Sequence, residues 1–205
     1  MVEPLGPVLT AKGAATRARL LAAASEQLRT DGRLEIAVVA SRAGVAQSVL
    51  YRYFGGKDGL VEAVVHEFYD AYSEAVFDAP LEPEATWVQR ERLRLEREVH
   101  FLYAHPLGRT VTAGLLHEAA ATRADAARQR EQALAAARNI RHGQRTGQLD
   151  RSVDAGLAGA AIIGALRAMM SDALARDPPP PAQLVVDAAI RLGRALLPEA
   201  PAQLS

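Results

Sequence analysis

Apolar residues along most of this chain recur at spacings of three and four, the period of an α-helix. Residues 14–31 show the pattern, because Leu20, Ala24 and Leu28 share one face while most charged residues occupy the other. Gly32 follows directly and marks a helix end. No segment alternates apolar and polar residues as a half-buried strand does. The chain is therefore predicted to be all-α.

Glycine and proline divide this pattern into nine predicted helices. They are expected at 14–31, 35–43, 47–54, 57 to about 80, 84–104, 107–115, 118–143, 153–176 and 182–197. The prolines at 80 and 83 end the fourth helix, and the four at 178–181 form a stiff connector before the last.

Composition indicates a soluble globular protein with one domain, or a small domain joined to a larger one. The 205 residues are 49% hydrophobic and 23% charged, unlike a disordered chain. The absence of cysteine excludes a disulfide scaffold and a thiolate metal site, and it fits a cytoplasmic protein. The longest apolar run, residues 155–166, is shorter than the roughly 20 residues of a membrane span. We expect a core helix there, no membrane partner and no export signal.

Basic residues gather near the start of the chain although the net charge is zero. The first 60 residues contain eight Lys and Arg and five Asp and Glu, so the remainder carries a matching negative excess. This asymmetry suggests a small basic module attached to a larger body.

The second and third predicted helices are joined by a tight turn at Gly44-Val45, the arrangement of a helix-turn-helix. Leu50 and Phe54 lie four residues apart on the third helix and can pack inward, which leaves its polar face outward. On that face Gln47 and Ser48 can hydrogen-bond base edges, Val49 can contact a thymine methyl, and Arg52 also points outward. Donors with the reach for phosphates are Arg42, Tyr51, Tyr53 and Lys57.

Residues 16–32 and 39–65 closely resemble the DNA-binding domain of the TetR family of transcriptional regulators. The resemblance is carried by Ala43-Gly44-Val45, by LYRYF at 50–54, and by Lys57 and Leu60. It implies a homodimer that binds a palindromic operator on double-stranded DNA and releases it when a small molecule enters the larger domain. By position, Tyr51, Tyr53 and Lys57 would contact phosphates, and residues 47–49 would read bases.

The resemblance also implies a division at about residue 60. Residues 1–60 would form the DNA-binding domain, with a flexible arm at 1–12, and residues 61–205 the effector-binding and dimerisation domain. Three positions depart from the family pattern: Ala46 replaces a helix-capping Ser or Thr, Val49 replaces Thr, and Val38 replaces an acidic residue. These departures affect base preference and helix capping rather than the fold.

Small and apolar residues on the last two predicted helices could form either an intrachain contact or a four-helix dimer interface, and the resemblance favours the interface. The residues concerned are Gly156, Gly159, Ala160, Ile163, Leu184, Ala188 and Leu192.

A largely apolar effector is expected to lie between helices of the larger domain. Its candidate lining residues are Phe68, Tyr72, Phe101, Leu116, His117 and Met169. We expect no cofactor, catalytic residue or metal: His66 and Asp70 have the spacing of a ligand pair, but the sequence offers no third ligand. The alternative is a helical small-molecule-binding or enzymatic protein whose first 60 residues are only structural. The sequence does not distinguish a repressor from an activator.

Overall fold

The all-α prediction is confirmed by a computed structural model, which describes residues 10–78, 80, 85–114 and 116–200. Nine α-helices and one π-helical turn make up the regular structure of these residues. They are α1 (Ala11–Asp31), α2 (Ile36–Arg42), α3 (Gln47–Phe54), α4 (Lys57–Ser73), η1 (Glu74–Asp78), α5 (Trp87–Ala104), α6 (Gly108–Thr112), α7 (Ala119–Arg145), α8 (Ala155–Ala175) and α9 (Ala182–Leu196).

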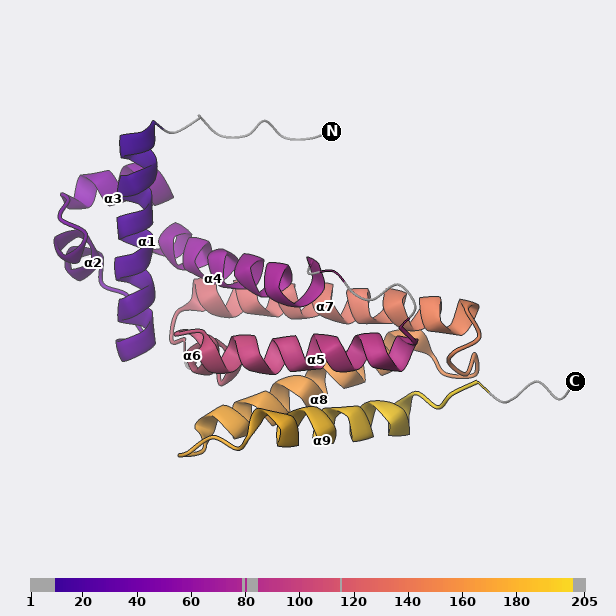
Figure 1. The fold of residues 1–205 in the computed structure, drawn as a ribbon. Helices are drawn as coiled ribbons and strands as arrows, with labels where there is room; N and C mark the ends of the chain where they lie inside the picture. The colour runs from indigo at the N-terminus through magenta and orange to yellow at the C-terminus, as the bar shows by residue number, and fades with distance from the viewer. Residues whose placement is uncertain (1–9, 79, 81–84, 115, 201–205) are drawn as a thin grey trace, which may run out of the picture.

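Helices α1–α3 form a small cluster at one end of an elongated body, and α4 leads from that cluster into the body (Figure 1). In the body, α4 packs on α7, α7 on α8, and α5 on α9. The chain after α9 returns to the loop between α7 and α8, where Leu149 and Glu199 form an isolated β-bridge. One hydrophobic core runs from Leu20 and Leu50 through Phe68 to Val186, so the cluster and the body share buried contacts.

The first helix begins earlier than its apolar pattern predicts. Thr10 is its N-cap, and the Thr10 hydroxyl accepts a hydrogen bond from the amide of Gly13 at 3.2 Å. Residues 11 and 12 therefore belong to α1 rather than to a flexible arm, and residues 1–9 of that predicted arm lie outside the described residues. Helix α4 ends at Ser73, where it passes into η1 before Pro80, and Pro83 lies outside the described residues.

Helix α8 differs from the core helix expected from the sequence. Only 22% of its most apolar stretch is buried inside the chain, whereas a core helix would be mostly buried. By length and composition alone, the helix would be long and apolar enough to cross a membrane. Leu157, Ala160, Gly164 and Ala168 follow one another along an exposed side, and Leu157 is 75% exposed. Because these residues are three or four positions apart, they form a continuous apolar stripe that is available to another helix.

Candidate functional site

The turn between α2 and α3 has the geometry of a helix-turn-helix. Gly44 has a φ of 66°, a conformation that favours glycine, and its amide donates to the carbonyl of Ser41 at 3.1 Å. The Val45 amide donates to the carbonyl of Ala40 at 3.0 Å. These bonds reverse the chain and fix the angle at which α3 leaves the turn.

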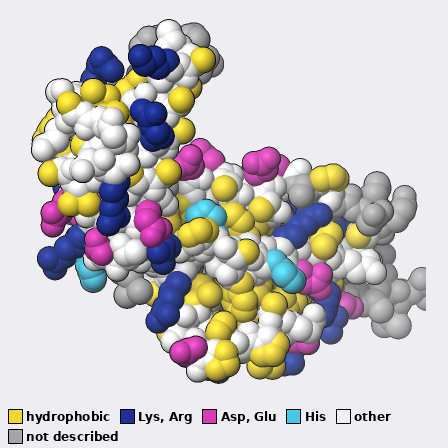
Figure 2. Space-filling model, turned by 60° about the vertical axis from the view of Figure 1, so that its left-hand side comes forward, with side chains coloured by type: hydrophobic (Ala, Val, Ile, Leu, Met, Phe, Trp, Pro, Cys, Tyr) yellow, Lys and Arg dark blue, Asp and Glu magenta, His cyan; other side chains and the backbone are white. Residues whose placement is uncertain are grey.

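Helix α3 buries its apolar side and exposes its polar side, as the spacing predicts. Leu50 is completely buried, and Phe54 packs against the same core. The exposed side chains are Gln47, Ser48, Tyr51 and Arg52, together with Arg42 at the end of α2, and Val49 is half-buried. Tyr51 is 52% exposed, so its ring and hydroxyl are accessible from solvent. Figure 2 shows Lys and Arg side chains around this end of the molecule.

Two arginines lie over aromatic rings at this end of the protein. The guanidinium carbon of Arg52 lies 5.4 Å from the ring centroid of Tyr53, and that of Arg17 lies 5.4 Å from the centroid of Phe54. Tyr53 is half-buried against the core, so it positions α3 as well as offering a hydroxyl. Contacts of these residues with DNA remain a prediction.

The first turn of α3 has no side-chain cap. Ala46 occupies the N-cap position with φ −71° and ψ 149°, the extended backbone that a capping residue adopts. The amides of this first turn therefore donate no hydrogen bond to an N-cap side chain.

Replacing Ala46 with serine should stabilise the protein, because the serine hydroxyl would accept a hydrogen bond from an amide in the first turn of α3. We expect the free energy of unfolding to rise by about 1 kcal/mol. Urea unfolding of the two proteins at the same pH measures the difference. Ala46→Gly, which lacks a side-chain acceptor, is the control. If serine gave no more stability than glycine, the assignment of this N-cap would be wrong.

Glu118, the N-cap of α7, joins the body to the helix-turn-helix. Its Oε1 lies 2.9 Å from the Nζ of Lys57 and accepts a hydrogen bond from the amide of Leu34 at 2.8 Å. The adjacent His117 amide donates to the carbonyl of Gly32 at 2.8 Å. These contacts connect the start of α7 to the loop before α2 and to Lys57, a predicted phosphate contact. These contacts could not be predicted from the sequence, because Glu118 is remote from both partners along the chain.

The dimer residues predicted on α8 lie on two different sides of the helix. Gly159 is buried against α7, and a Cβ there would lie 2.9 Å from the Ala133 carbonyl oxygen, so its small size serves intrachain packing. Ile163, four residues on, lines an interior cavity on the same side. Gly156 and Ala160 are exposed. Because successive residues differ by about 100° around a helix, adjacent positions such as 159 and 160 face different neighbours.

The predicted residues of α9 also differ in exposure. Leu184 is 55% exposed, whereas Ala188 and Leu192 are half-buried, and Leu192 lines a cavity. Of the predicted residues, Ala160 thus lies on the exposed apolar stripe of α8, and Leu184 is exposed on α9.

The predicted effector residues are only partly brought together. Phe68 and Tyr72 line a cavity of about 50 Å³ under α4, and the ring of Phe101 lies 5.7 Å from each of theirs. Met170 rather than Met169 lines this cavity, one position away on the helix. Among the other predicted residues, Leu116 is buried in the main core, and the side chain of His117 is exposed.

Polar groups beside the small cavity are bonded to one another. Asp125 accepts hydrogen bonds from the Tyr69 hydroxyl and from the guanidinium of Arg167, whose Nη2 lies 2.6 Å from Oδ2. Burial and the neighbouring Asp125 raise the pKa of the Tyr69 hydroxyl above its usual value. Burial also raises the pKa of Glu98 to about 7, although a hydrogen bond with Tyr72 opposes this change.

The raised pKa of Glu98 predicts a pH-dependent stability. Because the carboxyl binds a proton more tightly in the folded chain, its stabilising contribution is complete below about pH 4.5 and is lost as pH rises through 7. We expect wild type to lose up to about 3 kcal/mol relative to Glu98→Gln between pH 5 and pH 8. Urea unfolding of both proteins at the two pH values measures this difference. Parallel pH profiles would show that Glu98 is not the responsible group.

His66 and Asp70, the pair with metal-ligand spacing, both face a cation. The Nη2 of Arg128 lies 3.1 Å from His66 Nδ1 and 3.2 Å from Asp70 Oδ1. A guanidinium thus occupies the position between the two side chains.

A further cavity lies elsewhere, between α5, α7, α8 and α9. Its volume is about 320 Å³, and its walls are mainly aliphatic, with the indole of Trp87 at one end. No pattern in the sequence identifies Trp87 as a lining residue, because four helices must be packed before this space exists.

Comparison with known proteins agrees with this geometry. Residues 20–64 match the family described as bacterial regulatory proteins, tetR family. The fold matches a Rhodococcus sp. protein assigned to the TetR family of transcriptional regulators, with 18% identity, a TM-score of 0.74, and coverage of 88% of this chain and 98% of that chain. It matches SmeT, the repressor of the Stenotrophomonas maltophilia multidrug efflux pump SmeDEF, with 17% identity, a TM-score of 0.73, and coverage of 92% and 94%.

A third solved structure with this fold is the Bacillus subtilis transcriptional regulator FadR in complex with stearoyl-CoA. Its identity is 16%, its TM-score 0.72, and the match covers 85% of this chain and 96% of that chain. No curated protein matches the sequence. These matches show that the chain has the fold of TetR-family transcriptional regulators, with a helix-turn-helix that matches the family model over residues 20–64. The resemblance to the TetR family is therefore confirmed.

Proposed function

We propose that this protein is a cytoplasmic repressor that binds a palindromic DNA operator as a homodimer and releases it when a small molecule binds the larger domain. The observation that carries the proposal is α3, which presents Gln47, Ser48, Tyr51 and Arg52 outward from a helix-turn-helix. Such a helix fits a major groove, with its first residues toward base edges. SmeT, which shares the fold, is a repressor.

The two kinds of predicted DNA contact can be separated by mutation. Lys57→Ala should weaken binding on all sequences and reduce the salt dependence by about one counterion, because Lys57 would contact phosphate. Gln47→Ala should instead relax base preference, with a loss of about 1–3 kcal/mol confined to one position of the operator. Binding to single-base operator variants at two salt concentrations distinguishes these effects. Equal losses on all sequences for Gln47→Ala would remove its base-reading role.

The exposed apolar stripe on α8 supports the homodimer. Figure 2 shows hydrophobic side chains gathered over the lower part of the body, where α8 and α9 lie in Figure 1. Pairing α8 and α9 with their two-fold copies would bury Leu157, Ala160, Gly164 and Leu184. It would also hold two copies of α3 at a fixed separation, which a palindromic site requires.

The Glu118 joint supports a mechanism of release. A ligand that displaces α7 would move Glu118 relative to Leu34 and Lys57, and this would favour a different separation of the two α3 helices. The ligand would then bind more tightly to the dimer with one separation of the α3 helices, and DNA to the dimer with the other. Binding of the ligand would therefore weaken the affinity for DNA, and binding of DNA would weaken the affinity for the ligand.

Electrophoretic mobility shift with fragments enriched from a random duplex pool tests the proposal. We expect a single shifted species that contains two chains per palindrome. Shifts that are independent of sequence would contradict operator recognition.

A further inference from the structure

The cavity between α5, α7, α8 and α9 is lined in part by the start of α5 and the end of α9, which lie at the end of the body that is remote from the helix-turn-helix (Figure 1). It is separate from the 50 Å³ space under α4, although Leu166 borders both. At about 320 Å³ it falls within the range of small-molecule sites, and the same volume of liquid would hold on the order of ten waters. The smaller space would hold one or two.

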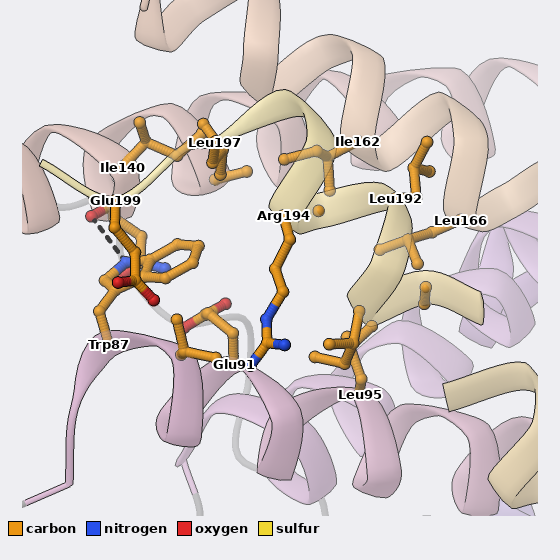
Figure 3. A pocket seen from close by; sticks show the side chains of 16 residues that line it. Trp87, Glu91, Leu95, Ile140, Ile162, Leu166, Leu192, Arg194, Leu197 and Glu199 are labelled. Atoms are coloured by element: carbon orange, nitrogen blue, oxygen red, sulfur yellow. Dashed lines mark hydrogen bonds between the residues drawn. The ribbon is translucent and has the colours of Figure 1, made fainter. Parts of the chain in front are cut away.

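The walls of this cavity favour an apolar occupant. Figure 3 shows the indole of Trp87 at one end, with aliphatic side chains from three other helices around it. The aliphatic lining includes Leu95, Ile140, Ile162, Leu166, Ile190 and Leu197. Water confined by such surfaces makes few hydrogen bonds, so its displacement makes the free energy of binding of an apolar molecule more favourable.

Charged groups at the cavity are balanced rather than left free. Glu91 is held by the guanidinium of Arg94, and burial raises the pKa of its carboxyl. The indole Nε1 of Trp87 already donates to the Asn139 carbonyl, at 3.4 Å. The two remaining charged side chains, Arg194 and Glu199, are exposed and opposite in charge. An ionic ligand would therefore lose its hydration without gaining a buried counter-charge.

We propose that this cavity binds an uncharged, mainly hydrocarbon or aromatic molecule, with a ring packed against Trp87. Any effect of this ligand on DNA affinity rests on the proposed function, but occupancy of the cavity does not. Binding is therefore measured without DNA, and its failure is distinguishable from a failure of operator recognition.

Trp87 is the single tryptophan of the chain and therefore reports directly on the cavity. The probe is N-phenyl-1-naphthylamine, an uncharged aromatic molecule that quenches tryptophan emission on close approach. Titration of the full chain should give saturable quenching at one probe per chain. The charged comparison is 8-anilino-1-naphthalenesulfonate, which adds a sulfonate to a similar ring system and should bind at least tenfold more weakly.

Gly193 provides a matched pair of variants. It lines the cavity, and a Cβ added there meets no atom within 4 Å, so a side chain can enter without moving the backbone. Gly193→Leu should occupy part of the cavity and weaken binding of the neutral probe at least tenfold. Gly193→Ala makes nearly the same change in helix propensity with little added volume and should weaken probe binding much less than Gly193→Leu does. Thermal unfolding of both variants verifies that they are folded.

Three results would overturn the proposal. The first is no saturable quenching of Trp87 by the neutral probe. The second is unchanged probe affinity in a folded Gly193→Leu protein. The third is tighter binding of the sulfonate, which would show that Arg194 recruits anions and that the ligand class is charged.

Discussion

Replacing Gly59 with alanine should destabilise the helix-turn-helix and abolish DNA binding. Helix propensity alone predicts the opposite, since alanine is favoured over glycine in a helix by about 1 kcal/mol. A Cβ at position 59, however, would lie 2.0 Å from the carbonyl oxygen of Phe54, where α4 begins close to the end of α3. The backbone must move to relieve this clash, so we expect a loss of roughly 3 kcal/mol or more.

Thermal unfolding and operator binding of the Gly59→Ala protein measure this effect. The control is Gly193→Ala, because a Cβ at that position meets no atom within 4 Å and the change should be neutral or stabilising. If Gly59→Ala unfolded at the wild-type temperature and bound DNA normally, the close approach of α3 to α4 would not exist in solution.

Replacing Gly164 with arginine should separate the proposed dimer into monomers. Gly164 is exposed on the apolar stripe of α8, and a Cβ there meets no atom within 4 Å, so the single chain tolerates a side chain. In a two-fold interface the substitution introduces two arginines, one from each copy, and both would be buried without a counter-charge. Separated chains would bind the two half-sites of the operator independently, so operator affinity should fall on the order of a hundredfold.

Analytical ultracentrifugation gives the oligomeric state, and operator titration gives the affinity. Thr122→Arg is the control, because it adds the same charge at an exposed position of α7 away from the stripe. A Gly164→Arg protein that remained dimeric would place the interface on another face.

Local sequence features were sufficient to predict the elements and the exposed face of α3. Helix periodicity and the glycine stops placed α3 at the residues where it is found, and the four-residue spacing of Leu50 and Phe54 identified its buried side. The absence of a side-chain cap at Ala46 also followed from the residue type alone. These properties depend on neighbours within one helical turn.

Properties set by packing between distant helices were not predictable. Gly159 was assigned to a dimer interface because it is small, but its small size accommodates α7. The predicted effector residues centred on Phe68, whereas the larger space adjoins Trp87, because its volume depends on how four helices meet. The Lys57–Glu118 ion pair joins residues on two helices whose separation no periodic pattern encodes.

The central claim is that this chain recognises a specific DNA sequence as a two-fold dimer. Selection from a random duplex pool with the full-length protein, at a stated salt concentration, followed by sequencing, tests it most directly. We predict enrichment of a palindrome whose half-sites lie about one helical turn apart, and loss of that enrichment in Gly164→Arg. Failure to enrich any sequence over a range of salt concentrations would contradict the claim.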